Sequence, residues 1–147
     1  MPAAVRLLAA SRTADDIADL NAAAGALAVL VNEGTEGADL SEWSTAAFRF
    51  HDLIMERSGN TTLGLIGAVL REVVARHMSR AVTASTNLVE IESQFKKTIR
   101  AFTKLTGLID AGDVEEAEEY WRGHMDRAAK GMLWGNLGAE TVIDLFV

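Results

Sequence analysis

The sequence has no cysteine, one proline and few aromatic residues, and each of these shortages excludes or disfavours a kind of structure or site. Without cysteine there are no disulfides and no thiolate metal ligands, as is usual for a cytoplasmic protein. The proline is Pro2, so no proline interrupts a helix downstream. One tyrosine and five phenylalanines are few for a β-sheet protein, whereas alanine and leucine, which favour helices, are abundant. The composition predicts an all-α fold.

Basic residues are in deficit: lysine and arginine total 14 against 21 acidic residues, for a net charge of −7. A DNA-binding domain usually presents a basic face to phosphate groups, so these residues are not expected to contact DNA. No apolar run approaches the roughly 20 residues needed to cross a bilayer, and the N-terminus lacks the basic-then-apolar order of a signal peptide. We expect one soluble cytoplasmic domain with its own core.

Apolar residues recur every three or four positions along most of the chain, as they do on the buried side of helices. Residues 3–10 and 14–32 form the first two predicted helices. Thr13, which two acids follow closely, is a good cap for the second. Asp39 or Ser41 is predicted to cap the third helix.

Turn residues separate the remaining predicted helices. Ser58-Gly59-Asn60 ends the third helix, and Asn60 or Thr61 caps a fourth that reaches a weak break at 81–84. A fifth helix restarts at Ser85 or Thr86, and Ala111-Gly112-Asp113 separates it from a sixth. A short helix over 139–146 completes the set. The prediction is an antiparallel bundle of six to seven helices with short connections.

Sequence motifs of common enzyme classes are absent. The twelve glycines form no phosphate-binding loop of the pattern G-x-x-x-x-G-K-[ST], and no serine lies in a G-x-S-x-G turn. None of the three histidines has a glutamate three residues before it, as di-iron bundles require. An enzyme is therefore not predicted.

His51 and His124 are the candidate functional residues because each falls on the apolar side of its predicted helix. A buried imidazole needs a polar partner or loses hydration energy, so two of them on different helices indicate a shared polar site. Imidazoles bind zinc and nickel, but such ions ordinarily have at least three protein ligands. The alternative is that both are ordinary core histidines. His77, beside Arg76 and Arg80, is predicted to lie on a helix surface.

Three groups of residues occur in an order and with a spacing that are typical of one protein family. They are Leu8-Ala9-Ala10 with Thr13–Leu20, Phe50-His51 with Ser58-Gly59-Asn60 and Leu63, and Ile109–Asp113 with Ala117 and His124. Together they span almost the whole chain. They resemble the FCD domain, the effector-binding and dimerisation domain of FadR-type regulators in the GntR superfamily. The resemblance implies an antiparallel helical bundle that binds small molecules, often carboxylates, and signals to an N-terminal winged helix-turn-helix.

The resemblance also bears on metal binding. Many FCD domains hold a divalent metal through an aspartate four residues before the histidine of the Phe-His pair, through that histidine, and through two later histidines. In this chain Ala47 stands at the aspartate position and Phe102 at that of the first later histidine, which leaves His51 and His124. Because alanine and phenylalanine cannot coordinate a metal, we expect no cofactor. Zinc or nickel at the two histidines is the alternative.

The resulting prediction is an effector-sensing domain over residues 1–147. Its pocket, for a small and preferably carboxylate effector, is formed by His51, His124, Phe102, Trp121 and Ala47. The domain is expected to form a homodimer and to act on DNA only through a DNA-binding domain that these residues do not include. Either the sequence begins inside a longer regulator or the domain acts by itself. The alternative function is a structural or partner-binding bundle without an effector site.

Overall fold

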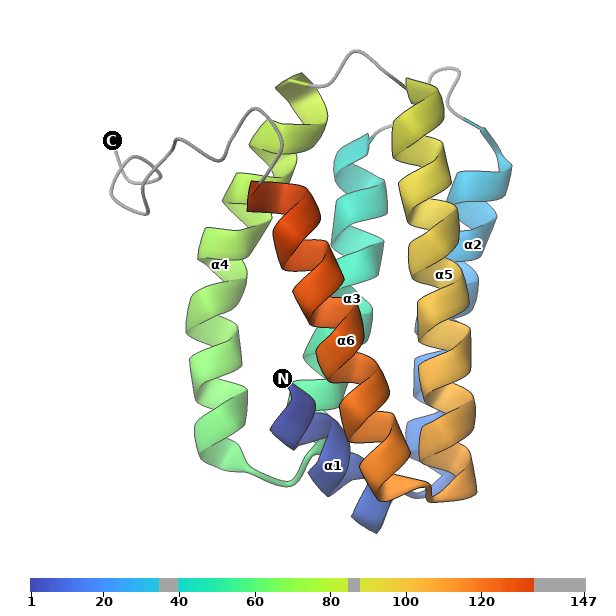
Figure 1. Ribbon diagram of the computed structural model, residues 1–147, viewed down its shortest axis with the longest axis vertical. Helices are drawn as coiled ribbons and strands as arrows, with labels where there is room; N and C mark the ends of the chain where they lie inside the picture. The colour runs from blue at the N-terminus through green and yellow to red at the C-terminus, as the bar shows by residue number, and fades with distance from the viewer. Residues whose placement is uncertain (35–39, 85–87, 134–147) are drawn as a thin grey trace.

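The computed structural model describes residues 1–34, 40–84 and 88–133, which form six α-helices and no strand (Figure 1). The helices are α1 (Pro2–Ser11), α2 (Ala14–Asn32), α3 (Leu40–Arg57), α4 (Thr61–Ala84), α5 (Leu88–Ala111) and α6 (Val114–Leu133). The helices from α2 to α6 run in alternating directions (Figure 1). The predicted antiparallel all-α bundle is confirmed. None of these six helices has both the length and the hydropathy needed to span a membrane.

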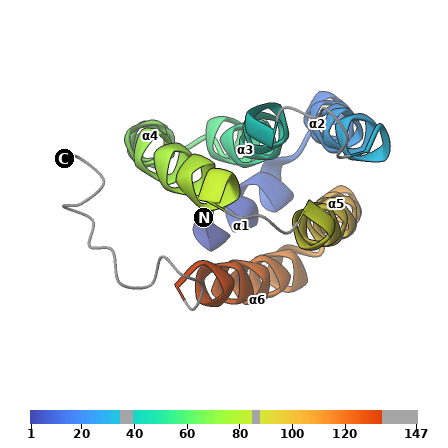
Figure 2. The same ribbon diagram turned by 90° about the horizontal axis from the view of Figure 1, so that it is seen from above.

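Two layers of helices enclose α1. Seen from above, α4, α3 and α2 form one layer and α5 and α6 form the other, with α1 between them (Figure 2). The short helix contacts α3, α5 and α6, and its residues Ala4, Val5, Leu8 and Ala9 are fully buried. Most buried apolar side chains of α2, α3, α5 and α6 belong to the same core. The centre of the bundle is therefore α1, although it is the shortest of the helices.

Local sequence signals set several helix ends as predicted. Thr13 caps α2 because its hydroxyl accepts a hydrogen bond from the Asp16 N–H (3.2 Å), while the Asp16 carboxylate accepts one from the Thr13 N–H (2.8 Å). Gly59 follows α3 with a φ of +73°, a left-handed conformation that glycine adopts without strain. The Asn60 side chain caps α4 by accepting from the Leu63 N–H at 3.0 Å.

One boundary prediction is wrong, and another is narrowed to one of its two alternatives. Ser41 lies inside α3, which begins at Leu40, so of the two predicted caps only Asp39 is left. The break expected at 81–84 does not occur, since α4 continues to Ala84 and this stretch contains neither glycine nor proline to end it. The cap at Asp39 and the helix over 139–146 lie outside the described residues.

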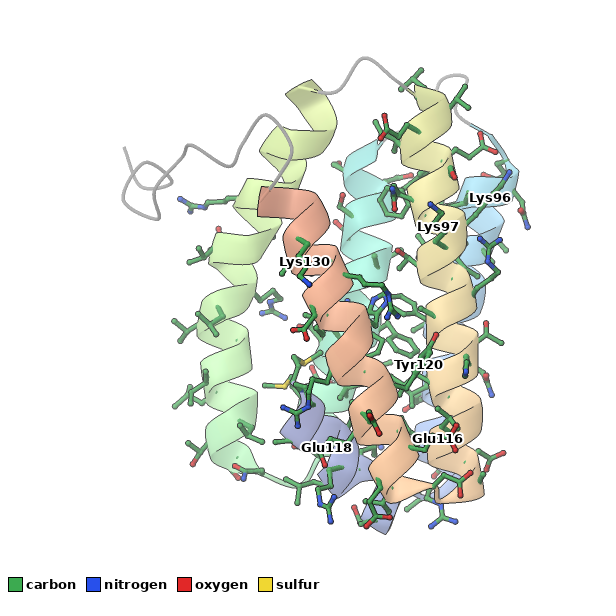
Figure 3. The ribbon with its side chains drawn as sticks, viewed as in Figure 1. Lys96, Lys97, Glu116, Glu118, Tyr120 and Lys130 are labelled. Atoms are coloured by element: carbon green, nitrogen blue, oxygen red, sulfur yellow. The ribbon has the colours of Figure 1, made fainter. Side chains whose placement is uncertain are left out.

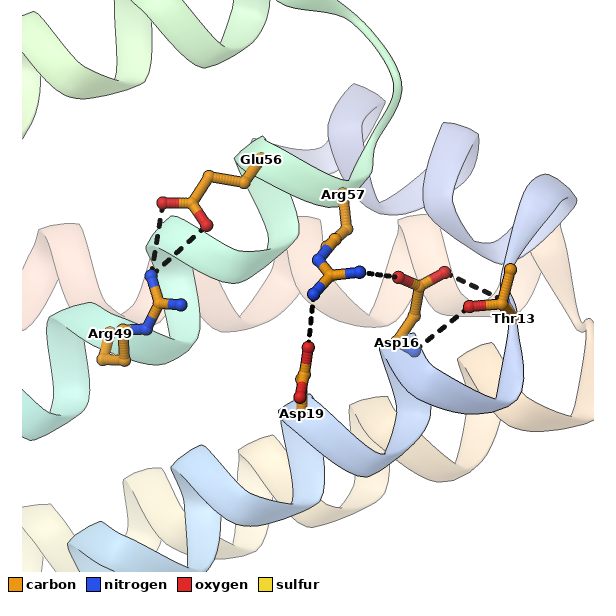
Figure 4. A network of polar contacts seen from close by, with 6 residues as sticks. All are labelled: Thr13, Asp16, Asp19, Arg49, Glu56 and Arg57. Carbon is orange, nitrogen blue, oxygen red and sulfur yellow. Dashed lines mark hydrogen bonds and ion pairs between the residues drawn. The ribbon is translucent and has the colours of Figure 1, made fainter.

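The capping box of α2 also joins two helices (Figure 4). Asp16 is only 6% exposed, and its second carboxylate oxygen accepts a hydrogen bond from Arg57, the last residue of α3, at 3.1 Å. Arg57 pairs with Asp19 as well. Hydrogen bonds between charged groups are stronger than neutral ones, and a buried carboxylate requires them. This contact fixes the end of α3, the helix that carries His51, against the start of α2.

One helix, α4, packs principally on α3. Gly67 faces Met55 of α3, because a Cβ at that position would lie 2.9 Å from Cε at the flexible end of the Met55 side chain. Leu63 packs against the core. Among the side chains of α4 that the structure describes, the exposed aliphatic ones are Leu65, Ile66, Val69 and Leu70. The apolar residues of this helix therefore occupy two sides, of which α3 covers one.

Candidate functional site

Four of the five residues predicted to form the pocket lie together between α3, α5 and α6. The ring of His51 lies 5.5 Å from that of Phe102 and 5.3 Å from that of Trp121, measured between centroids. Trp121 stacks on His124 at 4.6 Å with an interplanar angle of 23°. Ala47, the fifth, lies about one turn before His51 on α3 and packs against the hydrophobic core. The fold thus brings three distant parts of the sequence, on α3, α5 and α6, into one site.

Phe50, which the sequence did not single out for the pocket, lies at its centre. Its ring stacks on Phe102 with centroids 3.9 Å apart and planes at 4°, and Trp121 lies 6.1 Å from both rings. All three are fully buried. We call Phe50, His51, Phe102, Trp121 and His124 the aromatic cluster. The sequence could have identified Phe50 as a site residue, since it directly precedes His51 on the apolar side of the same helix.

The two histidines are part-buried and uncharged at neutral pH. Burial lowers the pKa of His51 to about 4, and the positive charges of His124 and of the amino terminus contribute to this shift. Burial also lowers the pKa of His124, with a contribution from Arg127. A neutral imidazole has one N–H donor and one nitrogen acceptor. Together the histidines therefore offer two donors and two acceptors without adding charge to the cluster.

The indole N–H of Trp121 is a buried donor that has no hydrogen-bond partner among the described residues. Most buried polar groups in proteins are paired, and leaving a donor unpaired costs roughly 1–3 kcal/mol. This N–H lies in the same residue that contacts both His51 and His124. A ligand atom that accepts a hydrogen bond here would remove the cost.

The residues of the cluster do not fit a metal centre. His51 and His124 supply two nitrogen ligands, whereas Ala47 and Phe102 occupy the positions of the other two. Among the side chains that the structure describes, no group of three or more histidines or carboxylates is arranged to hold an ion. Zinc sites usually have at least three protein ligands. The side chain of His77, predicted to lie on the surface, is outside the described part of the structure.

A solvent-open groove on α6 does not include the aromatic cluster. It is lined by Glu116, Glu119, Tyr120, Gly123 and Arg127, and its charged residues are exposed. Lys104 of α5 lies 4.7 Å from the centre of the Tyr120 ring. Figure 3 shows Glu116 and Lys130 on α6 among the solvated charges of the domain. The groove is a charged surface feature, and the buried unpaired donor lies in the cluster.

Because burial favours the neutral imidazole, the domain is expected to lose stability in acid. The pKa of His51 is about 4 in the folded chain and near 6.5 when unfolded, so the unfolded chain takes up the proton first. The contribution is complete above pH 6.5 and is lost as the pH falls toward 4. We expect urea unfolding at pH 7 and pH 4.5 to differ by about 2 kcal/mol from this residue. An equal loss in His51→Gln would assign the pH dependence to other groups.

The comparison with known families agrees with this arrangement. The family model of the FCD domain matches residues 2–127, which include α1 to α5, most of α6 and the whole aromatic cluster. No curated protein and no solved structure matches the sequence. The matched residues make up most of the chain. The chain therefore belongs to the FCD domain family, the regulatory effector-binding domains of GntR-type transcription regulators.

Proposed function

We propose that this FCD domain senses a small-molecule effector at the aromatic cluster and forms a homodimer within a GntR-type transcription regulator. The observation that carries the proposal is the convergence of His51, Trp121 and His124 in a domain of this family. Two neutral imidazoles and an unpaired indole N–H lie among apolar rings. Apolar walls with a few polar atoms are typical of small-molecule sites.

A small carboxylate is the effector class that we propose. Its oxygens accept hydrogen bonds, so they can pair with the indole N–H of Trp121 and with an imidazole N–H. The cluster itself contains no acid that would repel the anion. Asp52, the residue after His51, is paired with Arg71 at 2.9 Å. A bound anion would also raise the pKa of the neighbouring imidazoles, so binding is favoured as the pH falls.

A route for the signal begins at α1. This helix packs on α3, α5 and α6, which are the three helices that carry the cluster. A ligand that turns Trp121 or separates Phe50 from Phe102 would displace these helices and therefore α1. In the proposed regulator, which acts in the cytoplasm, this displacement reorients separate DNA-binding domains.

One observation favours a second function, a structural or partner-binding bundle without an effector. The rings of Phe50 and Phe102 stack at 3.9 Å, so they fill the space between α3 and α5 with apolar atoms. In that function His51 and His124 are core residues, and no small carboxylate binds.

Calorimetric titration with a panel of small carboxylates separates the two functions. We expect binding, with a matching rise in the unfolding temperature. Trp121→Phe keeps a ring but removes the N–H, so we expect its affinity to fall about 5- to 150-fold, equivalent to about 1–3 kcal/mol. Trp43→Phe is the matched control, because Trp43 is equally buried and packs edge-on against Phe95. No binding by any carboxylate, or equal losses in both variants, would contradict the proposed site.

A further inference from the structure

Arg127 of α6 carries a positive charge that no acid within the described residues neutralises. Arg122, earlier on the same helix, forms an ion pair with Glu118 at 2.9 Å. Arg127 forms no such pair in the part of the chain that the structure describes, and it lines the groove of about 290 Å³ together with Tyr120 and Gly123. A guanidinium without an acid partner is a suitable contact for an anion, because its N–H donors match the geometry of a carboxylate.

Gly123 leaves the space in which the Arg127 side chain lies. A Cβ at position 123 would be 3.2 Å from Nη1 of Arg127, closer than ordinary van der Waals contact. The guanidinium therefore lies back along α6, over the turn that precedes its own Cα, as long side chains on helices usually do. This places the charge beside the backbone of the residue that directly precedes His124.

His124 lies between Arg127 and the aromatic cluster. Residues three apart on a helix are neighbours, with Cβ atoms roughly 5–6 Å apart, so the side chains of His124 and Arg127 adjoin. The charge of Arg127 contributes to the lowered pKa of His124, as expected of groups this close. The imidazole also stacks on Trp121 at 4.6 Å. The unpaired indole N–H, the imidazole and the guanidinium therefore follow one another from the core to the surface of α6.

Two acids in the groove limit the charge that a ligand there can carry. Glu116 and Glu119 line the groove nearer the start of α6. Because a helix turns by about 100° per residue, Glu119 projects roughly 140° away from His124, whereas Arg127 projects only about 60° away. A carboxylate beside His124 and Arg127 therefore lies away from Glu119. A second carboxylate extending along the groove would meet like charges, which disfavours a ligand with two negative charges.

We propose that Arg127 is the cation that neutralises the bound effector, at the outer edge of the site formed with His124 and Trp121, and that the effector is a monocarboxylate. The aromatic cluster supplies hydrogen-bond donors but no positive charge, because both of its histidines are neutral at neutral pH. The inference rests on the proposed function. It adds a binding residue outside the cluster and limits the charge of the effector.

The preference for an acid over its uncharged amide tests the role of Arg127. Calorimetric titrations use propionate, butyrate and benzoate, each beside its primary amide, with succinate and glutarate as dicarboxylates. We expect a monocarboxylate to bind the wild type at least about 10-fold more tightly than its amide and than either dicarboxylate. Arg127→Gln keeps a polar side chain without the charge. It is expected to weaken binding of the acid about 10-fold and to leave binding of the amide within about 2-fold.

Arg122→Gln is the matched control, because Arg122 is an exposed arginine of the same helix that already pairs with Glu118 and does not line the groove. It is expected to keep the wild-type preference for the acid. A measurement without ligand checks the geometry: in an NMR titration, the pKa of His124 is expected to be higher in Arg127→Gln than in the wild type and in Arg122→Gln, since a neighbouring positive charge has been removed.

The contradicting results are distinguishable. If none of these monocarboxylates and amides binds the wild type, the proposed effector site is refuted and this inference with it. If binding falls in Trp121→Phe while Arg127→Gln keeps the preference for the acid, the site stands and the role of Arg127 is wrong. Equal losses in the two arginine variants would indicate attraction by overall charge and not contact with Arg127. Dicarboxylates that bind as tightly as monocarboxylates would overturn the limit on charge.

Discussion

Ala47→Asp combined with Phe102→His is expected to convert the aromatic cluster into a site that binds zinc or nickel. The first change places a carboxylate about one helical turn before His51, and the second places an imidazole where the Phe102 ring now lies 5.5 Å from that of His51. Together with His124, four ligands then converge, as a tetrahedral zinc site requires. At a metal concentration about 100 times Kd, we expect the free energy of unfolding to rise by about 2.7 kcal/mol, measured by thermal unfolding with and without metal.

The wild type and a triple variant that adds His124→Leu are the controls for this experiment. The wild type should show no metal-dependent shift, because its two histidines are fewer than the three protein ligands that zinc sites usually have. The triple variant keeps three ligands and should show a smaller shift than the double variant. A shift in the wild type would show that His51 and His124 suffice to hold an ion. No shift in the double variant would show that α3, α5 and α6 hold these four positions too far apart for one metal.

Phe102→Ala is expected to lower the free energy of unfolding by about 3–5 kcal/mol, a large fraction of the roughly 5–15 kcal/mol typical of a whole domain. Phe102 is fully buried and stacks on Phe50, so the substitution leaves a cavity between α3 and α5. Surrounding rings cannot collapse into this space without losing their own contacts with α6. Urea unfolding followed by circular dichroism, with an unchanged dependence on urea concentration, measures the loss.

Phe48→Ala is the matched control for this loss of stability. Phe48 lies on α3 two residues before Phe50, is only part-buried, and its ring is 6.4 Å from that of His51. Because the same atoms are removed from a partly solvated position, we expect a loss under about 2 kcal/mol. Equal losses at Phe48 and Phe102 would contradict the central position of Phe102 in the core.

The candidate site could be predicted only in part. His51 and His124 were identified because a polar residue on an apolar side is visible in the sequence, and the family resemblance located Phe102. The sequence does not contain the distance between rings that makes Phe50 and Phe102 a stack. Nor does it contain the burial that lowers the pKa of His51 or leaves the Trp121 N–H without a partner, because both depend on what three separate helices pack around them.

In the fold, too, the features set by residues close in sequence could be predicted, whereas those set by contacts between distant helices could not. The sequence by itself determined the helical class, the family and the helix ends at Thr13 and Asn60, because a cap and the N–H groups it pairs with lie within about three residues of each other. Only the tertiary structure decided that Asp16 is buried against Arg57, and that α3 covers one apolar side of α4 while Leu65, Ile66, Val69 and Leu70 remain exposed. Periodicity shows that a helix has an apolar side, but the neighbour that covers it comes from a distant part of the chain.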